Sequence, residues 1–261
     1  NVQNESGFKM KIRENVKKKY LLAVFAGAVI LAAGGTATWL LWKGSSDFYL
    51  SINGSEVSQE EYLAAVDAVE YDTKMEIQEE YDTPYGEDFW EKEYPDGYGY
   101  EILAENAEGW LKYTHAVYSL AEKYGDIDDG SYEAAVKRWE ADQESRAEKT
   151  AKGEVVYGLR EYPLDVYISY EISMLKETYC NDYDREGMDL TEEEIQEHYE
   201  SREWIFDESE ENADLETARI AVERELREQK YDEIIAQKEQ DSQVDGDRDA
   251  VLRFTLKNIS K

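Results

Sequence analysis

The sequence predicts a mainly α-helical protein with one N-terminal transmembrane helix, followed by a helical domain with a small two-stranded sheet. Three observations predict this fold. Residues 20–42 form a long apolar run without a charged side chain. Much of the later chain has apolar side chains at the helical spacing of three and four residues. Strand-like segments stand at 48–54 and 250–259, so the sheet is expected to pair the start and the end of the helical domain.

The apolar run YLLAVFAGAVILAAGGTATWLLW is long enough to cross a membrane, which takes about 20 apolar residues. A cleaved signal peptide is the alternative, but its apolar region is only about 7–15 residues long. Trp39 and Trp42 extend the run, which favours an uncleaved anchor. Six basic residues precede it, and the positive-inside rule keeps that end in the cytoplasm. The prediction is a single-pass protein of the cell membrane, with a cytoplasmic tail (1–19), a transmembrane helix (20–42) and an extracytoplasmic domain (43–261).

Small residues within the predicted transmembrane helix bear on oligomeric state. Ala28, Ala32 and Thr36 are spaced by four, and small residues at this spacing permit close contact between two membrane helices. The pattern is common in alanine-rich spans. It leaves a homodimer open without requiring one.

The chain after the apolar run is strongly acidic. The first 43 residues hold seven of the 29 Lys and Arg but two of the 61 Asp and Glu. Residues 44–261 therefore have 22 basic and 59 acidic side chains, a formal net charge of −37. Nucleic acids bind through Lys and Arg that neutralise phosphates, so this charge argues against a nucleic-acid partner. The 21 Tyr, 6 Trp and 6 Phe argue against disorder, because disordered acidic chains are poor in aromatic residues.

Local signals define the first elements after the anchor. FYLSING, residues 48–54, predicts a short strand that ends in an Asn-Gly turn. Ser58 with Glu61 three residues later predicts a capping box at the start of a helix. The segment 82–100 is rich in aromatic residues, Gly and Pro, which indicates a structured loop or very short helices.

The middle of the chain is predicted to be helical. The clearest helix covers 101–125, and a further helix covers 131–149. Residues 153–170 are ambiguous, because their β-branched and aromatic side chains favour a strand whereas Pro163 suits the first turn of a helix. A helix over 163–181 is the preferred interpretation.

The last elements lie on both sides of a short acidic connector, FDESEENADLE (206–216). Thr191 and Glu194 predict a second capping box before it. A long amphipathic helix follows it. The alternating segment 250–259 predicts the terminal strand.

The segment DYDREGMDLTEEE, residues 182–194, has the ligand spacing of a calcium-binding loop. A calcium ion prefers clustered oxygen ligands, and Gly187 would supply the sharp turn. In so acidic a chain the same letters also arise when one helix ends near Gly187 and another is capped at Thr191. The candidate metal ligands are Asp182, Asp184, Glu186 and Glu193.

The sequence shows no recognised catalytic pattern. His115 and His198, the two histidines, fall in separate predicted helices and are more typical of partly exposed helix residues than of ligands or general bases. No nucleophile elbow, phosphate-binding glycine loop or paired Cys/His spacing occurs. The single cysteine, Cys180, excludes an internal disulfide. No cofactor is expected.

Several segments, taken in order, resemble the chaperone domain of SurA- and PrsA-like foldases. FYLSINGSEVSQEEY resembles the strand, turn and capped helix that open that domain. GEDFW, EKEYPDGYGYEI and the later LAEKYGD look like its next part. LTEEEIQEHYESRE is similar to the helix before the family's catalytic insert, and ETARIAVERELREQKYDEIIAQ to the helix that returns after it. The resemblance covers about 48–261.

The resemblance implies a chaperone without its own enzyme activity. In PrsA-like proteins a parvulin-type prolyl isomerase domain lies between the last two of those helices, and the connector 206–216 is too short to contain one. The implied function is to hold unfolded, newly exported polypeptides in an aromatic-lined groove, since aromatic side chains give a large contact area at small entropic cost. Each candidate lining residue could equally be a core residue. The candidates are Phe89, Trp90, Tyr94, Tyr98, Tyr100 and Trp110.

Two other functions remain open. The chain could be an anchored envelope protein that binds one specific partner through its acidic surface. It could also be an enzyme with an unrecognised site. A general chaperone suppresses aggregation of unrelated proteins, whereas an interaction protein selects one, so the range of clients separates the first two functions.

Overall fold

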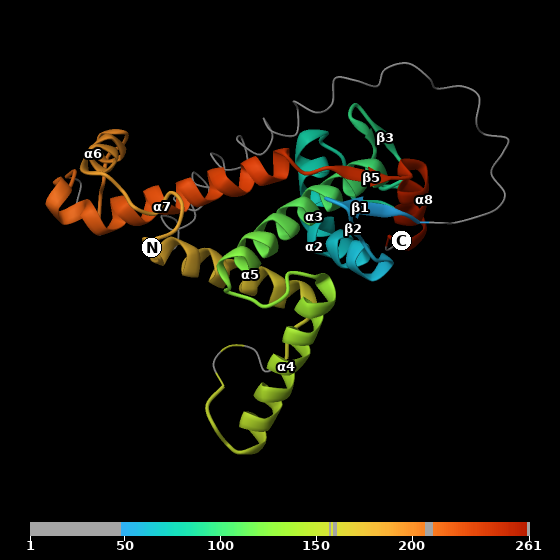
Figure 1. Cartoon of the computed structure of the whole chain (residues 1–261). Coiled ribbons are helices and arrows are strands. Elements are labelled where there is room, and N and C mark those ends of the chain that lie inside the picture. The colour runs from blue at the N-terminus through green and yellow to red at the C-terminus, as the bar shows by residue number, and fades with distance from the viewer. Residues whose placement is uncertain (1–47, 157, 159–160, 207–210, 260–261) are drawn as a thin grey trace. The chain divides into compact units, whose positions relative to one another are not determined.

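The computed structural model describes residues 48–156, 158, 161–206 and 211–259, which are mainly helical (Figure 1). They belong to the second of two units of the chain, Asp47–Lys261. The predicted tail (1–19), the predicted transmembrane helix (20–42) and its small residues lie outside the described residues. Among the residues that are described, no helix is both long and apolar enough to span a membrane.

A three-stranded antiparallel sheet joins the two ends of this unit. Strand β1 (Leu50–Ile52) lies between β2 (Ser55–Glu56) and β5 (Val244–Gly246), as Figure 1 shows for β1 and β5. Asn53 and Gly54 form the tight turn between β1 and β2, and both have the positive φ that such turns require, 54° and 81°. The prediction of a small sheet is confirmed, but the sheet has three strands, and β1 pairs with 244–246 instead of the predicted segment 250–259.

The predicted strand at 250–259 is wrong, because this segment is helix α8 (Arg248–Asn258). The Asp247 side chain accepts a hydrogen bond from the backbone N–H of Ala250 at 3.0 Å and so caps the helix. Val251 and Thr255, four residues apart, are buried on one helical face. The short alternating pattern was thus compatible with a helix as well, and the strand that pairs with β1 lies just before the cap.

Helices α2 (Gln59–Glu80) and α3 (Gly99–Tyr124) pack against each other. Ser58 caps α2 as predicted, with its Oγ 3.0 Å from the backbone N of Glu61, but the Glu61 carboxylate contacts His115. The segment between the helices contains turns and two short paired strands, β3 (Glu93–Tyr94) and β4 (Gly97–Tyr98). It is therefore the structured loop, without helices.

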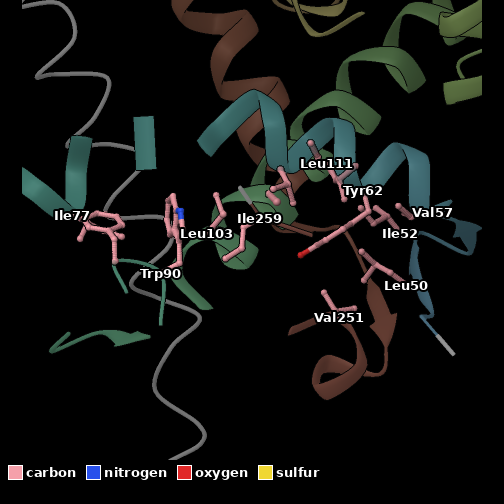
Figure 2. Close-up of a cluster of buried hydrophobic side chains, with 14 of the residues drawn as sticks. Leu50, Ile52, Val57, Tyr62, Ile77, Trp90, Leu103, Leu111, Val251 and Ile259 are labelled. Carbon is pink, nitrogen blue, oxygen red and sulfur yellow. The ribbon is translucent and has the colours of Figure 1, made fainter. Parts of the chain in front are cut away.

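The first core cluster lies where β1, α2, the 82–100 loop, α3 and α8 meet, and Figure 2 shows side chains from these elements together. The Tyr62 hydroxyl and Thr255 Oγ1 share a buried hydrogen bond of 2.5 Å, which ties α2 to α8. Burial raises the pKa of Tyr62 to about 12. The fully buried side chains of this cluster include Ile52, Val57, Tyr62, Ile77, Phe89, Leu103 and Leu111.

The other helices are α4 (Tyr132–Ala151), α5 (Leu164–Asn181), α6 (Glu192–Glu200) and α7 (Leu215–Gln240). The preferred helix at 163–181 is confirmed, with Pro163 as the residue that precedes its first turn. The predicted capping box at α6 is confirmed too, with Thr191 Oγ1 3.2 Å from the backbone N of Glu194 and the Glu194 carboxylate bonded back to Thr191.

Two more core clusters hold these helices. The second lies among the C-terminal half of α3, α5 and the C-terminal half of α7, and includes Val117, Leu120, Ile172, Tyr179, Met188, Tyr231 and Ile235. The third is small and joins α6 to the start of α7 through Ile195, Trp204, Ala218 and Val222. Helix α3 therefore contributes to the first and the second cluster.

A half-buried carboxylate near the end of α7 makes stability depend on pH. Loss of water raises the pKa of Glu239 from 4.5 to about 7, and Lys112 offsets only part of this effect. The folded state thus favours the protonated acid. The resulting contribution to the free energy of unfolding is present below pH 4.5 and is lost as the pH rises through about 7.

We therefore expect Glu239→Gln to stabilise the protein at pH 8 by on the order of 1 kcal/mol, and by less at pH 5. Urea unfolding at both pH values measures the difference. Glu233→Gln, an exposed change on the same helix, is the matched control and should give no pH-dependent gain. An equal effect of Glu239→Gln at both pH values would contradict the prediction.

Candidate functional site

Three of the six predicted groove residues lie in the first core cluster. Phe89, Trp90 and Tyr94 are only 2%, 5% and 6% exposed. The rings of Phe89 and Trp90 pack edge to face, with centroids 5.0 Å apart, and the Tyr94 hydroxyl donates to the Phe89 carbonyl oxygen at 3.0 Å. In this structure these side chains hold the 82–100 loop in place and are not accessible to a bound polypeptide.

The other three differ in exposure. Tyr98 is 39% exposed and stacks on the partly buried Tyr100, with ring centroids 5.6 Å apart. Trp110 is partly buried and packs against both the first and the second cluster. Of the six, Tyr98 therefore offers the most surface to a partner, and the six do not surround one opening.

Two of the four predicted calcium ligands, Asp182 and Glu186, contact basic side chains in this structure. Asp182 accepts hydrogen bonds from Arg185 Nε at 2.9 Å and from the backbone N of Asp184 at 3.2 Å. The Glu186 carboxylate lies 4.0 Å from Lys123 Nζ. Within the described residues, no three His, Cys, Asp or Glu side chains are arranged to hold a metal ion. The Arg185 guanidinium, which the prediction from acidic spacing did not consider, supplies positive charge inside this segment.

Each histidine joins its helix to a neighbouring element. His115 Nε2 on α3 lies 2.8 Å from Glu61 Oε1 on α2. His198 on α6 packs against Trp204, with ring centroids 5.9 Å apart. They lie in the separate helices α3 and α6, as predicted.

Glu171 of α5, whose side chain is 11% exposed, is an anchoring group that sequence reasoning did not single out. Its carboxylate accepts hydrogen bonds from Tyr118 at 2.8 Å, Tyr167 at 2.9 Å and two nitrogens of Arg138 at 2.7 and 3.0 Å. Burial, and then the negative charge of Glu171, raises the pKa of both tyrosines. Because four donors occupy the carboxylate, its role is to fix α5 against α3 and α4. In a chain with 61 acidic residues nothing in the sequence marks this one.

An open groove of about 920 Å³ runs along one side of α4. Trp139 Nε1 and Gln143 Nε2 both donate to the Tyr162 carbonyl oxygen at 3.0 Å, so the segment before α5 forms the other wall. The lining is mainly apolar with two acidic residues, and consists of Trp139, Gln143, Glu144, Ala147, Thr150, Ala151, Glu161, Tyr162 and Pro163.

These features describe a mainly helical protein with an open groove along α4. No family model matches the chain, and no solved structure matches it. The chain is, however, similar to a chaperone. It is 32% identical over 200 residues to the chaperone for lacto-N-biosidase of Bifidobacterium longum subsp. longum, and the match covers 76% of this chain and 71% of the relative.

At this level of identity and coverage, the chain belongs to the same chaperone family as the Bifidobacterium protein. The sequence-based prediction of a chaperone is confirmed at this general level. A chaperone of this kind has a polypeptide as its partner.

Proposed function

We propose that this protein is a membrane-anchored extracytoplasmic chaperone dedicated to one client, an exported glycoside hydrolase of the lacto-N-biosidase kind. The observation that carries the proposal is the similarity to the chaperone for lacto-N-biosidase, which extends over 76% of the chain. A match of this extent covers most of the helical unit and therefore favours a similar kind of client.

The predicted anchor supports the location. The uncharged run 20–42 with six basic residues before it is typical of a single-pass helix with a cytoplasmic N-terminus. An exported client is unfolded when it leaves the export channel and exposes apolar segments that aggregate. A tethered chaperone would meet the client at that point.

The relationship to SurA- and PrsA-like foldases stays part of the proposal. The strand β1, its Asn-Gly turn and the Ser58 cap of α2 support it, as does the return of α7 towards the sheet that contains β5. The connector between α6 and α7 has no room for a parvulin-type domain. The proposed mechanism is therefore holding and release of the client without prolyl isomerisation.

The proposed contact with the client is weak and largely aromatic. Tyr98 and the groove along α4, which Trp139 helps to line, offer accessible aromatic surface. They replace Phe89, Trp90 and Tyr94, which are buried, as candidate contacts. The runner-up function, a scaffold that binds one envelope partner through its acidic face, is favoured by the net charge of the chain, −32. A scaffold stays bound to its folded partner, whereas a chaperone is needed only during folding.

Co-production tests the proposal. A lacto-N-biosidase would be produced with and without the whole 261-residue chain, and its soluble hydrolytic activity measured. We expect the chain to raise the yield of active enzyme severalfold and to be dispensable once the enzyme is folded. Two unrelated aggregating proteins, followed by light scattering, should gain little. An unchanged yield of active enzyme would contradict the dedicated-chaperone proposal. Lasting association of the chain with the folded enzyme would favour the scaffold function.

A further inference from the structure

The solvent-facing side of α5 differs from the rest of this acidic molecule. One of the eight exposed residues of α5 is charged, compared with six of nine on α2 and six of nine on α4. Val166, Tyr170 and Met174 are spaced by four and are 43%, 55% and 43% exposed. Cores of protein interfaces are depleted in charge and enriched in Tyr and Met. The uncharged surface, called the α5 face below, consists of Val166, Ser169, Tyr170, Ser173, Met174 and Thr178.

Two of the four hydroxyl groups of the α5 face donate hydrogen bonds within the helix itself. Ser173 Oγ donates to the Ser169 carbonyl oxygen at 2.8 Å, and Thr178 Oγ1 donates to the Met174 carbonyl oxygen at 2.9 Å. A buried polar group without a partner costs free energy. Because these two donors are already paired, a partner can cover the face without leaving them unsatisfied. The small serines also leave room for close approach between the three larger side chains.

The α5 face is held rigidly from behind. On the opposite side of the helix, Ile168, Ile172 and Tyr179 are buried in the second cluster. Glu171 accepts its four hydrogen bonds from α3, α4 and α5, and Lys176, the one basic residue of α5, is bonded to Asp232 of α7 at 2.5 Å. A preorganised surface loses little entropy on binding, which favours a partner.

Charge at the two ends of the α5 face indicates what would cover it. Asp165 lies just before the face, and Asp67 of α2 lies near it. Burial raises the pKa of the Asp67 carboxyl, and the negative charge of Asp165 raises it further. Glu177 lies at the far end, about 18 Å away along the helix axis at the usual rise per residue. Carboxylates at both ends attract basic groups and repel a second copy of this acidic chain.

We propose that the α5 face docks a segment of the client polypeptide in which apolar side chains are flanked by Lys or Arg at both ends. The proposal rests on the proposed function, since it names the part of a client that the chaperone recognises. The apolar side chains would pack between Val166, Tyr170 and Met174, and the basic ends would lie near Asp165 and Glu177. Such segments are exposed in an unfolded chain and become buried as the client folds, which releases them from the face.

Peptide binding to the whole chain tests the α5 face directly. The probes are three fluorescein-labelled peptides of equal length, followed by anisotropy: one with a Leu/Val centre and Lys ends, one with the same centre and Glu ends, and one with a Ser centre and Lys ends. We expect the first to bind most tightly. The double variant Tyr170→Glu/Met174→Glu should weaken its binding about tenfold or more, because it places charge in the middle of the apolar contact.

A matched control keeps the test specific. The variant Ala236→Glu/Gln240→Glu adds the same charge at the same spacing on exposed positions of α7. Its affinity for the peptide with the Leu/Val centre and Lys ends should stay within about twofold of that of the wild type. Circular dichroism checks that both variants are folded. Equal binding by the wild type and the Tyr170→Glu/Met174→Glu variant, or equal binding of the Ser-centred peptide, would overturn the proposal.

The two proposals can fail separately. If the wild-type chain does not raise the yield of active lacto-N-biosidase, the dedicated-chaperone function fails, while the peptide measurement still decides on the α5 face. If the wild-type chain raises the yield and the peptide affinities do not distinguish the Tyr170→Glu/Met174→Glu variant, the function stands and the docking site is elsewhere.

Discussion

Replacement of Arg185 by alanine is expected to lower the free energy of unfolding by about 3–5 kcal/mol, the usual cost of removing one partner from a buried ion pair. Arg185 is 8% exposed. Its two terminal nitrogens donate to the Asp126 carboxylate at 2.6 and 2.7 Å, and its Nε donates to Asp182 at 2.9 Å. Its guanidinium also lies over the rings of Tyr124 and Tyr179, at 4.9 and 5.2 Å from their centroids.

The cost arises because Asp126, itself poorly exposed, would keep its charge without a partner. Urea unfolding at pH 7 measures the loss. Arg224→Ala is the matched control, because the Arg224 side chain is 79% exposed and forms only a surface pair with Glu228, worth about 0–1 kcal/mol. Similar losses in the two variants would show that the Arg185 network does not stabilise the fold.

Arg185 also shows where inference from the sequence reached its limit. It lies inside the segment predicted as a calcium loop, and a motif of acidic residues gives no weight to the basic residue between them. The partner that decides the chemistry, Asp126, is 59 residues away in sequence. Local spacing cannot contain that information. In this structure two of the four predicted ligands, Asp182 and Glu186, lie beside the basic side chains of Arg185 and Lys123.

Features set by local chemistry were predictable. The caps at Ser58 and Thr191 and the stop at Gly125, which has a φ of 77°, depend on interactions within a few residues. The terminal segment 250–259 was predicted wrongly because its short alternating pattern fits a strand and also one face of a helix. The Asp247 cap and the contacts of Val251 with the first cluster stabilise the helix.

Burial of the aromatic residues was not predictable from the sequence alone. Phe89 and Tyr98 both lie in a loop rich in aromatic residues, yet one is 2% exposed and the other 39%. The difference depends on how the loop packs on the start of α3. There a Cβ on Gly99 would lie 2.8 Å from the Phe89 carbonyl oxygen, so this contact requires glycine. The α5 face was missed for a related reason, since its uncharged character becomes evident only when exposed residues are separated from buried ones.

Replacement of Leu103 by alanine is expected to cost about 2–5 kcal/mol, the range for removing a large aliphatic side chain from a packed core. Leu103 is fully buried in the first cluster, on the same side of α3 as Ala107 and Leu111. Ile220→Ala is the matched control, because Ile220 is 86% exposed and should change stability by less than about 0.5 kcal/mol.

The variant also tests whether the first two clusters unfold together. Helix α3 continues from Leu103 into the second cluster, where Val117 and Leu120 are buried, so opening of the first cluster should loosen the end that supports α5. Hydrogen exchange in Leu103→Ala should therefore become faster in α5 as well as in α2. If exchange in α2 accelerates and α5 keeps its protection, the clusters are separate cooperative units. The rigid support inferred for the α5 face would then come from the second cluster and the Glu171 network, without the first cluster.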